Sequence, residues 1–572
     1  MPVALRHNLP LCLADSSPTM LPLGCLLMIA LACSAGFAAD LVATDFGIKA
    51  DGKTDDGPAI LKMVDAARAQ KAPVRLVFPE RQTIYAATGA DRYLFQLRAT
   101  EGITIDGGGS TFLLHPDIRF ANLEGARQPS LKNLNVDFAP HPFIETLIEA
   151  ADPKRQFVDV RVLHPAEAGA LGGPTKQDGE QWFGGFVWCE NGEHPKAARH
   201  YAVKSVTPLE DGRARIFYDG NAFARDIADH VKPGATRFSV PRPGVAHRHG
   251  PGALFEIHDA VDARLERISV WGAPWFVFSI YRNEGTLEFI DVDVRPTPGA
   301  DRLMAACRDA FHVTGNRARL LFDGCDTAGL GDDDYNFCVL SSAIQKVLAP
   351  TEIVIRQKFP IQYNPMRVGE TLMVMNRENA VIGSATIARY EETPLHDRQP
   401  TRPGGRCPEV TITLQTPIRG LEKGLTAWSK EAANPDTTMR NCTCAFSCRM
   451  QTSLTIERCK FLCYNVSYGM SPGDDNVEGP GPDRMRIVDS EFLAGRGSGY
   501  SAQCGGAGPI KTCRLQEISI ERCTFRAPLT IRKARAISLK DNRFYGEVTI
   551  GEHEELEMTR NTRDDKPFNL PR

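Results

Sequence analysis

The chain has 572 residues, with 67 Lys and Arg against 70 Asp and Glu, so its formal net charge is −3 at neutral pH. No basic run dominates, which disfavours a nucleic acid or an anionic membrane as a partner and favours a neutral one. Forty-nine Gly and 39 Pro beside 42% hydrophobic residues are typical of short strands joined by turns, rather than of long helices.

An apolar segment near the N-terminus has the form of a signal peptide. It runs over residues 21–35 and is followed by small residues that suit cleavage after Ala38. The run is too short for a comfortable membrane span. We therefore predict a signal peptide over residues 1–38, with Met20 as an alternative start, and a secreted or periplasmic protein. A lipoprotein anchor at Cys33 is the weaker alternative.

The cysteine content points to thiols rather than to a metal centre. The predicted signal peptide holds three of the 16 cysteines, and the 13 that remain are an odd number, so at least one is unpaired or paired outside the chain. Five cysteines fall within residues 442–463, but they lack a C-x-x-C pair and a neighbouring His. Buried thiols or disulfides are favoured over zinc there, and neither a metal nor a cofactor is predicted.

Residues 39–142 are expected to form an N-terminal cap and the first repeats. The helix predicted here carries apolar residues at helical spacing, namely Ile60, Leu61, Val64 and Ala67. Thr54 or Asp55 is expected to cap it, with Asp56 and Pro58 in the first turn. A short strand follows at residues 74–79. This helix would cover the open apolar end of a solenoid.

From residue 100 onward one phrase recurs, in which apolar residues alternate and a Phe often closes the phrase. Its copies fall at residues 103–109, 131–138, 265–270, 287–292, 320–325, 454–461, 485–492, 518–525 and 537–544. A constant phrase at irregular spacing predicts stacked coils joined by loops of different length. A Cys, Ser or Asn before x-Phe would stack into a ladder at a turn, so Cys459 and Cys523 are interpreted as ladder positions.

Two stretches interrupt the repeats. Residues 143–245 and 343–435 contain longer alternating strands, with polar loops rich in Gly and Pro. Each is predicted to be a small β-barrel or sandwich inserted into a loop, serving either as structural padding or as a wall of the substrate cleft. The repeats then divide into catalytic coils at residues 246–342 and C-terminal coils at residues 436–572.

Two acidic clusters lie about one solenoid coil apart. Asp309 stands in the run R-D-A-F-H, and Asp332 and Asp333 stand in the run G-D-D-D-Y-N, which begins one coil later. Glycosidic bonds are cleaved by two carboxyl groups, one protonating the leaving oxygen and one activating water or attacking the anomeric carbon. Adjacent aspartates repel, which raises one pKa as a general acid requires. A solvated turn or a calcium site is the alternative interpretation.

The opening D-F-G-I-K-A-D-G-K-T-D-D resembles the start of pectate-lyase-like enzymes, and the acidic clusters resemble glycoside hydrolase family 110. That family carries D-A-x-H on one coil and G-L-x-D-D-x-x-N on the next. The resemblance implies a right-handed parallel β-helix and an exo-acting α-1,3-galactosidase that inverts configuration without a metal. Asp309, Asp332 and Asp333 would be its catalytic carboxylates. We favour Asp332 as the acid and the other two on the water side, but the sequence leaves open which aspartate is acid and which is base.

The remaining site candidates come from the same matched motifs. His312 and Asn336 are expected to bind galactose hydroxyls, with a turn cap as the less favoured interpretation of His312. Trp275 is expected either to stack on a sugar face or to belong to the core. Arg302 and Glu478 are further candidates for substrate binding, and a surface salt bridge is the alternative role for each. The chain departs from the family where the motif ends in Cys338-Val339 instead of His-Gly, and a family Arg finds no match in residues 441–445.

Other functions remain open at this point. A second β-helix enzyme such as a polygalacturonase also uses an Asp followed by G-D-D one coil later, but its G-H-G and R-I-K signatures are not found. A non-catalytic β-helix adhesin or carbohydrate-binding protein would tolerate exchange of Asp309 and Asp332. In each case the expected partner is a carbohydrate, with no nucleic acid and no membrane span. The sequence leaves the oligomeric state open, a homodimer included.

Overall fold

The computed structural model describes residues 39–569, except residues 71–72, 173–175, 178–179, 182, 191–197, 220–230, 246–251, 358–365, 378–379, 393–408, 463–464, 469–478, 494–501 and 505–514. The predicted signal peptide and the Cys33 anchor lie outside the described residues. Within them, no helix has the length and apolar character needed to cross a membrane.

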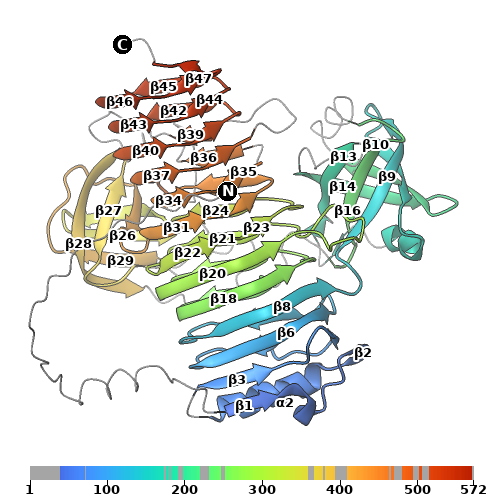
Figure 1. Ribbon diagram of the computed structural model, residues 1–572. Coiled ribbons are helices and arrows are strands. Elements are labelled where there is room, and N and C mark those ends of the chain that lie inside the picture. The colour runs from blue at the N-terminus through green and yellow to red at the C-terminus, as the bar shows by residue number, and fades with distance from the viewer. Residues whose placement is uncertain are drawn as a thin grey trace, which may run out of the picture. The chain divides into compact units, whose positions relative to one another are not determined.

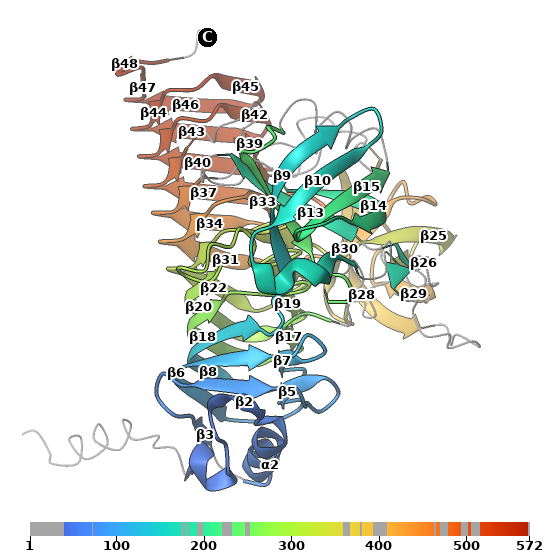
Figure 2. The same cartoon turned by 90° about the vertical axis from the view of Figure 1, so that its right-hand side faces the viewer.

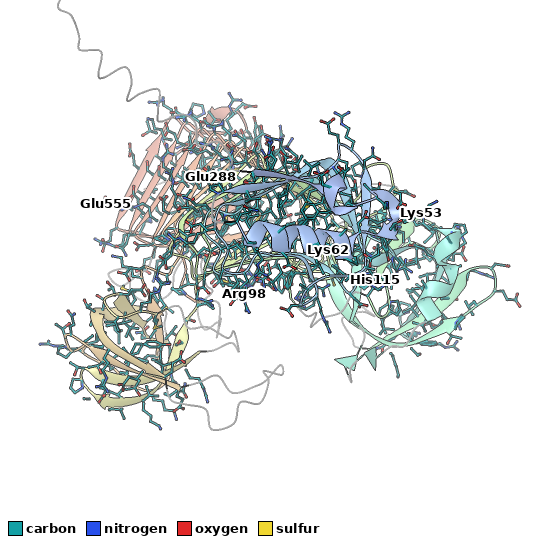
Figure 3. All side chains as sticks on the ribbon, turned by 90° about the horizontal axis from the view of Figure 1, so that it is seen from below. Lys53, Lys62, Arg98, His115, Glu288 and Glu555 are labelled. Carbon is teal, nitrogen blue, oxygen red and sulfur yellow. The ribbon has the colours of Figure 1, made fainter. Side chains whose placement is uncertain are left out.

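The first described elements form the cap. They are β1 (Ala39–Val42), the 3₁₀ helix η1 (Ala43–Phe46), β2 (Asp51–Asp55) and α2 (Gly57–Arg68). Ile60, Met63, Val64 and Ala67 are the large and small apolar residues that α2 buries. Figure 3 looks at this end of the stacked coils and shows α2 lying across it, with the exposed Lys62 on the helix. Helix α2 therefore lies at the end of the coils where the capping helix was predicted.

The predicted helix start was one residue early. Asp56, expected in the first turn, is the N-cap residue. Its carboxylate accepts from the amides of Lys49 and Ala50 at 2.7 and 2.8 Å, so it anchors the preceding loop instead of the helix. The Asp55 carboxylate accepts from the amide of Gly57 at 3.0 Å, which provides the helix N-terminus with an acceptor.

Outside the two insertions, the chain winds into parallel sheets whose strands stack along one axis (Figure 1). One sheet has 11 strands: β5 (Tyr93–Gln96), β7 (Arg119–Asn122), β17 (Phe255–His258), β19 (Phe278–Tyr281), β21 (Phe311–Thr314), β24 (Tyr335–Cys338), β33 (Ser447–Met450), β36 (Asn465–Tyr468), β39 (Ala502–Cys504), β42 (Leu529–Lys533) and β45 (Val548–Glu552). Figure 2 faces several of these strands.

A second sheet has 23 strands, including β1 and β2. The others are β3 (Val74–Val77), β4 (Thr83–Ala86), β6 (Ile103–Leu114), β8 (Ser130–Phe138), β18 (Val261–Val270), β20 (Glu284–Val294), β22 (Arg319–Asp323), β23 (Asp326–Thr327), β31 (Asp436–Arg440), β32 (Thr443–Cys444), β34 (Leu454–Glu457), β35 (Lys460–Phe461), β37 (Arg484–Val488), β38 (Glu491–Phe492), β40 (Glu517–Glu521), β41 (Thr524–Phe525), β43 (Ala536–Lys540), β44 (Arg543–Phe544), β46 (Glu555–Thr559), β47 (Thr562–Arg563) and β48 (Lys566–Pro567). The predicted right-handed parallel β-helix is confirmed.

Both insertions are closed antiparallel barrels, which decides between the barrel and the sandwich. The first consists of β9 (Phe143–Asp152), β10 (Phe157–Val162), β13 (Phe183–Glu190), β14 (Ala198–Pro208), β15 (Arg213–Asp219) and β16 (Thr236–Pro241), with η2 (Pro165–Gly172) and the short pair β11 (Lys176–Gln177) and β12 (Glu180–Gln181) between its strands. The second consists of β25 (Ser342–Ala349), β26 (Glu352–Gln357), β27 (Thr371–Met375), β28 (Val381–Glu392), β29 (Glu409–Leu414) and β30 (Thr426–Ser429). Each has its own apolar core.

The recurring phrase builds two internal ladders in the C-terminal coils. The closing Phe rings stack, with centroids 4.8 Å apart from Phe461 to Phe492 and 4.5 Å apart from Phe492 to Phe525. The polar residue before them hydrogen-bonds the next coil: the Cys459 amide donates to Ser490 Oγ at 3.0 Å, and the Cys523 amide to an Asn542 side chain at 2.9 Å. Both cysteines are buried free thiols, as the ladder interpretation predicted.

A ladder of buried asparagines supports the coils next to the acidic clusters. Asn283, Asn316 and Asn434 are each fully buried. Asn283 Nδ2 donates to Asn316 Oδ1 at 2.8 Å, and Asn316 Nδ2 donates to Asn434 Oδ1 at 2.9 Å. The Asn316 side chain also donates to the carbonyl of Ile280 at 3.1 Å. This ladder ties three successive coils together at one corner.

Asn316→Ala is therefore expected to destabilise the fold by about 2–4 kcal/mol, because each buried polar partner left unpaired costs about 1–3 kcal/mol. Denaturant unfolding followed by circular dichroism measures this. Asn135→Ala is the matched control, since its side chain makes an exposed bond to the Gly109 carbonyl and its loss should cost little. Equal losses in both variants would contradict a supporting role for the ladder.

Candidate active site

The two acidic clusters meet because β21 and β24 are parallel neighbours. Phe311 pairs with Tyr335 and His312 with Asn336. Extending this register backward aligns Asp309 with Asp333 and leaves Asp332 one residue further out. The amide of Ala310 donates to the Asp333 carbonyl at 3.0 Å, which fixes the alignment. The expectation that the clusters lie on neighbouring coils is confirmed.

Asp309 is oriented by His312. The Asp309 residue is 2% exposed, and its Oδ2 lies 2.7 Å from His312 Nδ1. Burial, followed by the like charge of Asp332, raises the pKa of Asp309. Burial alone would lower the pKa of His312, but its neighbours Tyr281 and Asp309 outweigh that and raise it. His312 therefore holds the buried Asp309 carboxyl in one orientation, and the two side chains form a charge-assisted pair.

Asp333 is anchored from the next coil, by β33. Ser447 Oγ donates to Asp333 Oδ1 at 2.7 Å, and Arg449 Nη2 lies 3.3 Å from Oδ2. Burial raises the pKa of Asp333 well above its usual range; Arg449 opposes this shift, and Asp309 and Asp332 reinforce it. Asp309 and Asp333 thus form an aligned buried pair in which a proton is favoured.

Asp332 is the most exposed of the three carboxylates. Its side chain is 31% exposed, and its Oδ2 accepts a 2.6 Å hydrogen bond from Arg308 Nη1. The Arg308 guanidinium also lies over the ring of Trp275, 5.2 Å from the ring centroid. Trp275 is half-buried, and its neighbour Phe276 packs on the His312 ring at 5.0 Å. The aromatic residues therefore border the acidic cluster.

One oxygen from each of Asp309, Asp332 and Asp333 lies within 4.8 Å of the other two. These carboxylates could together hold a cation, but Arg308, Arg449 and His312 supply positive charge at the same place, which opposes one. The separation is also shorter than the roughly 6.5–9.5 Å common in inverting glycosidases and closer to the roughly 5–5.5 Å of retaining ones. Spacing by itself therefore gives no support for inversion.

The other three predicted site residues lie in different places. Asn336 pairs in register with His312 on one side and Arg449 on the other, so it lies in the outward row of the catalytic coils. Arg302 instead donates to the Phe143 carbonyl at 3.1 Å and lies 3.4 Å from Glu167, both part of the first insertion. Among the described residues, its side chain bonds to these two residues and not to the acidic cluster. Glu478 lies outside the described residues.

Several contacts of the acidic cluster were not predicted from the sequence. Arg308, Ser447 and Arg449 all bind the carboxylates. The family's Arg has no match in residues 441–445, and Arg449 lies a few positions later, on β33. Cys338, in the place of the family's His, is 3% exposed and hydrogen-bonds the side chain of His312. For Arg308, its positive charge directly before Asp309 in the sequence was the signal that could have predicted its contact with a carboxylate.

Comparison with known proteins agrees with the sequence resemblance. No family model matches the chain. A protein named alpha-1,3-galactosidase B from Bacteroides thetaiotaomicron is 24% identical over 444 residues, covering 73% of this chain and 69% of that protein. Proteins named alpha-1,3-galactosidase A from Shewanella woodyi and Bacteroides fragilis are each 23% identical, covering 51% and 66% of this chain and 50% and 60% of their own lengths. The resemblance to α-1,3-galactosidases is thereby confirmed.

Solved structures with related folds include carbohydrate-active enzymes. The A-module of a mannuronan C-5 epimerase from Azotobacter vinelandii has a TM-score of 0.34 and 9% identity, covering 92% of this chain and 97% of that one. A family 28 exopolygalacturonase from Yersinia enterocolitica has a TM-score of 0.32 and 9% identity, covering 93% and 79%.

Proposed function

We propose that this protein is an exported glycoside hydrolase that releases terminal α-1,3-linked galactose from glycans. The observation that carries the proposal is the meeting of Asp309, Asp332 and Asp333 on two adjacent coils, with nearest oxygens within 4.8 Å. Glycoside cleavage needs at least two carboxyl groups in different protonation states, and these three have different surroundings. The sugar and linkage come from the relatives named alpha-1,3-galactosidase. Export is inferred from the apolar run over residues 21–35.

The three carboxylates are assigned two tasks. Asp309 and Asp333, the aligned buried pair, hold and activate the attacking water while sharing one proton, as their raised pKa values support. Asp332, the most exposed, faces the leaving oxygen and protonates it. Arg308 orients Asp332 through its 2.6 Å bond to Oδ2, and the Trp275 ring packs against the same guanidinium.

Galactose would be bound beside this cluster by His312, Asn336 and Arg449. His312 and Arg449 flank Asn336 in the strand register, so all three project from the same outward row. Trp275 offers an aromatic face at the border of the cluster. No cofactor takes part in this scheme, since proton transfer and water attack need only the carboxyl groups.

Galactose release tests this function directly. Purified protein is expected to free galactose from an α-1,3-linked galactobiose, and proton NMR is expected to show β-galactose first, because inversion of an α-linkage gives the β-anomer. Inversion rests on the family resemblance, so early α-galactose would overturn it and leave hydrolysis standing. A matched α-1,4-linked disaccharide is the control for linkage. Binding of the disaccharide without any release by folded protein would support a carbohydrate-binding protein instead.

A further inference from the structure

The segment that leads into the catalytic strand β21 is held by the first barrel. Residues 295–308 connect β20 to Asp309, and the barrel contacts begin with Arg237 on β16. Its Nη1 donates to Asp301 Oδ1 at 2.5 Å and its Nη2 to the Asp301 carbonyl at 2.8 Å. The apolar side chains of Phe143, Met304 and Cys307 pack together at the same junction. The barrel therefore contacts this segment at several points between Asp301 and Cys307.

Glu145, on β9, is the centre of this junction. It is fully buried, and its Oε1 accepts from the Leu303 amide at 3.1 Å and from Ser239 Oγ at 2.8 Å. Arg237 Nη2 lies 4.0 Å from Oε2. A buried carboxyl is costly unless it is hydrogen-bonded, so its position inside a barrel strand needs a reason. Its bond to Leu303 links the barrel to the segment that precedes Asp309.

From Leu303 the segment runs straight to the acidic cluster. The Ala305 amide donates to the Gly329 carbonyl at 2.7 Å, and the Gly331 amide donates to the Ala306 carbonyl at 2.9 Å. These bonds tie the segment to the turn that carries Asp332. Gly331 has no room for a side chain, because a Cβ there would come within 2.4 Å of the Cys307 carbonyl. Any displacement of the segment therefore moves both acidic clusters.

We propose that the first barrel is a positioning element for the catalytic carboxylates, and that Glu145 is the positioning residue through which it acts. This proposal rests on the proposed hydrolase function for its kinetic consequence, but the anchoring of residues 303–308 can be measured without a substrate. Glu145 touches no reacting atom. It fixes Leu303, and thereby Arg308 and Asp309, in the geometry that the carboxylates need.

Three variants test this role. Glu145→Leu removes the acceptor for Leu303, and we expect kcat to fall by about 10- to 100-fold with little change in KM, since a misplacement of about 1 Å can cost a hundredfold. Glu145→Gln keeps an oxygen acceptor and is expected to restore kcat to within about threefold. Val160→Ala is the matched control, because Val160 is fully buried in the apolar core of the same barrel, and the described residues of that core include none from the segment.

Hydrogen exchange supplies the readout that does not depend on activity. In Glu145→Leu, the amides of residues 303–308 are expected to exchange faster than in the unaltered protein, whereas Val160→Ala should speed exchange only within the barrel. Unchanged exchange at residues 303–308, or an equal loss of kcat in Val160→Ala, would overturn the positioning role. If the unaltered protein releases no galactose while the exchange pattern appears as expected, the hydrolase assignment fails and the anchoring stands.

Discussion

Asp309→Asn is expected to lower kcat/KM for galactose release by about a thousandfold or more while the protein remains folded. Carboxyl groups that move protons in the transition state typically contribute about 10²–10⁴-fold, and Asp309 is one of the two that hold the attacking water in the proposed scheme. The amide keeps the shape of the side chain and a hydrogen-bonding atom for His312, which lies 2.7 Å away. Initial rates with an α-1,3-linked disaccharide and with an activated aryl α-galactoside measure the loss.

Both substrates should be affected alike, because activating water is needed whichever group leaves. Asp291→Asn is the matched control: Asp291 lies on β20, one coil before β21, and has a positive φ of 51° that Asn adopts readily. It should keep full activity. A variant of Asp309 that retains more than about a tenth of the activity with native unfolding behaviour would exclude it from the water side.

The same variant has an expected signature in stability. Burial and Asp332 raise the pKa of Asp309 in the folded state. A carboxyl with a raised folded pKa favours folding most at low pH, and this contribution is lost as pH rises through that pKa. Asn cannot ionise, so it makes no such contribution. The Tm of Asp309→Asn should therefore fall less between acidic and neutral pH than the Tm of the unaltered protein.

The coils could be predicted because their inward residues obey a local rule. In the phrase that ends at Phe525, alternating apolar residues and one polar ladder position are fixed by the stacking of each coil on the next, so the pattern survives loops of any length. The meeting of Asp309 with Asp333 followed from the same rule, since a short loop separates their coils. Local periodicity was therefore sufficient to find the fold and the acidic centre.

Contacts across the insertions could not be read in this way. Arg449 lies beside Asp333 only because the second barrel leaves the solenoid after Asn336 and returns the chain to the next coil at β33. The number of residues between Asp333 and Arg449 is therefore set by the size of the barrel and not by the length of one coil. Arg302 shows a related effect: it lies near the motif in sequence, whereas in the structure its side chain contacts Phe143 and Glu167 of the first barrel.

Asp332→Asn separates the acid from the water-activating pair. If Asp332 protonates the leaving oxygen, its loss should cost about 10²–10³-fold with the disaccharide, whose leaving group needs a proton, but less than about tenfold with an aryl galactoside, whose leaving group does not. The exposed position of Asp332, 31% against 3% and 5% for the Asp309 and Asp333 side chains, is the reason for this assignment.

The competing arrangement gives the opposite pattern. Asp309 and Asp333 have raised pKa values, and if one of them were the acid, its Asn variant would show the dependence on leaving group and Asp332→Asn would not. Arg308→Gln adds an independent check, because Arg308 Nη1 donates to Asp332 Oδ2 at 2.6 Å and fixes that carboxyl. If Asp332 is the acid, Arg308→Gln should lower kcat/KM more for the disaccharide than for the aryl galactoside. Equal losses on both substrates in Asp332→Asn and in Arg308→Gln would place Asp332 with the water.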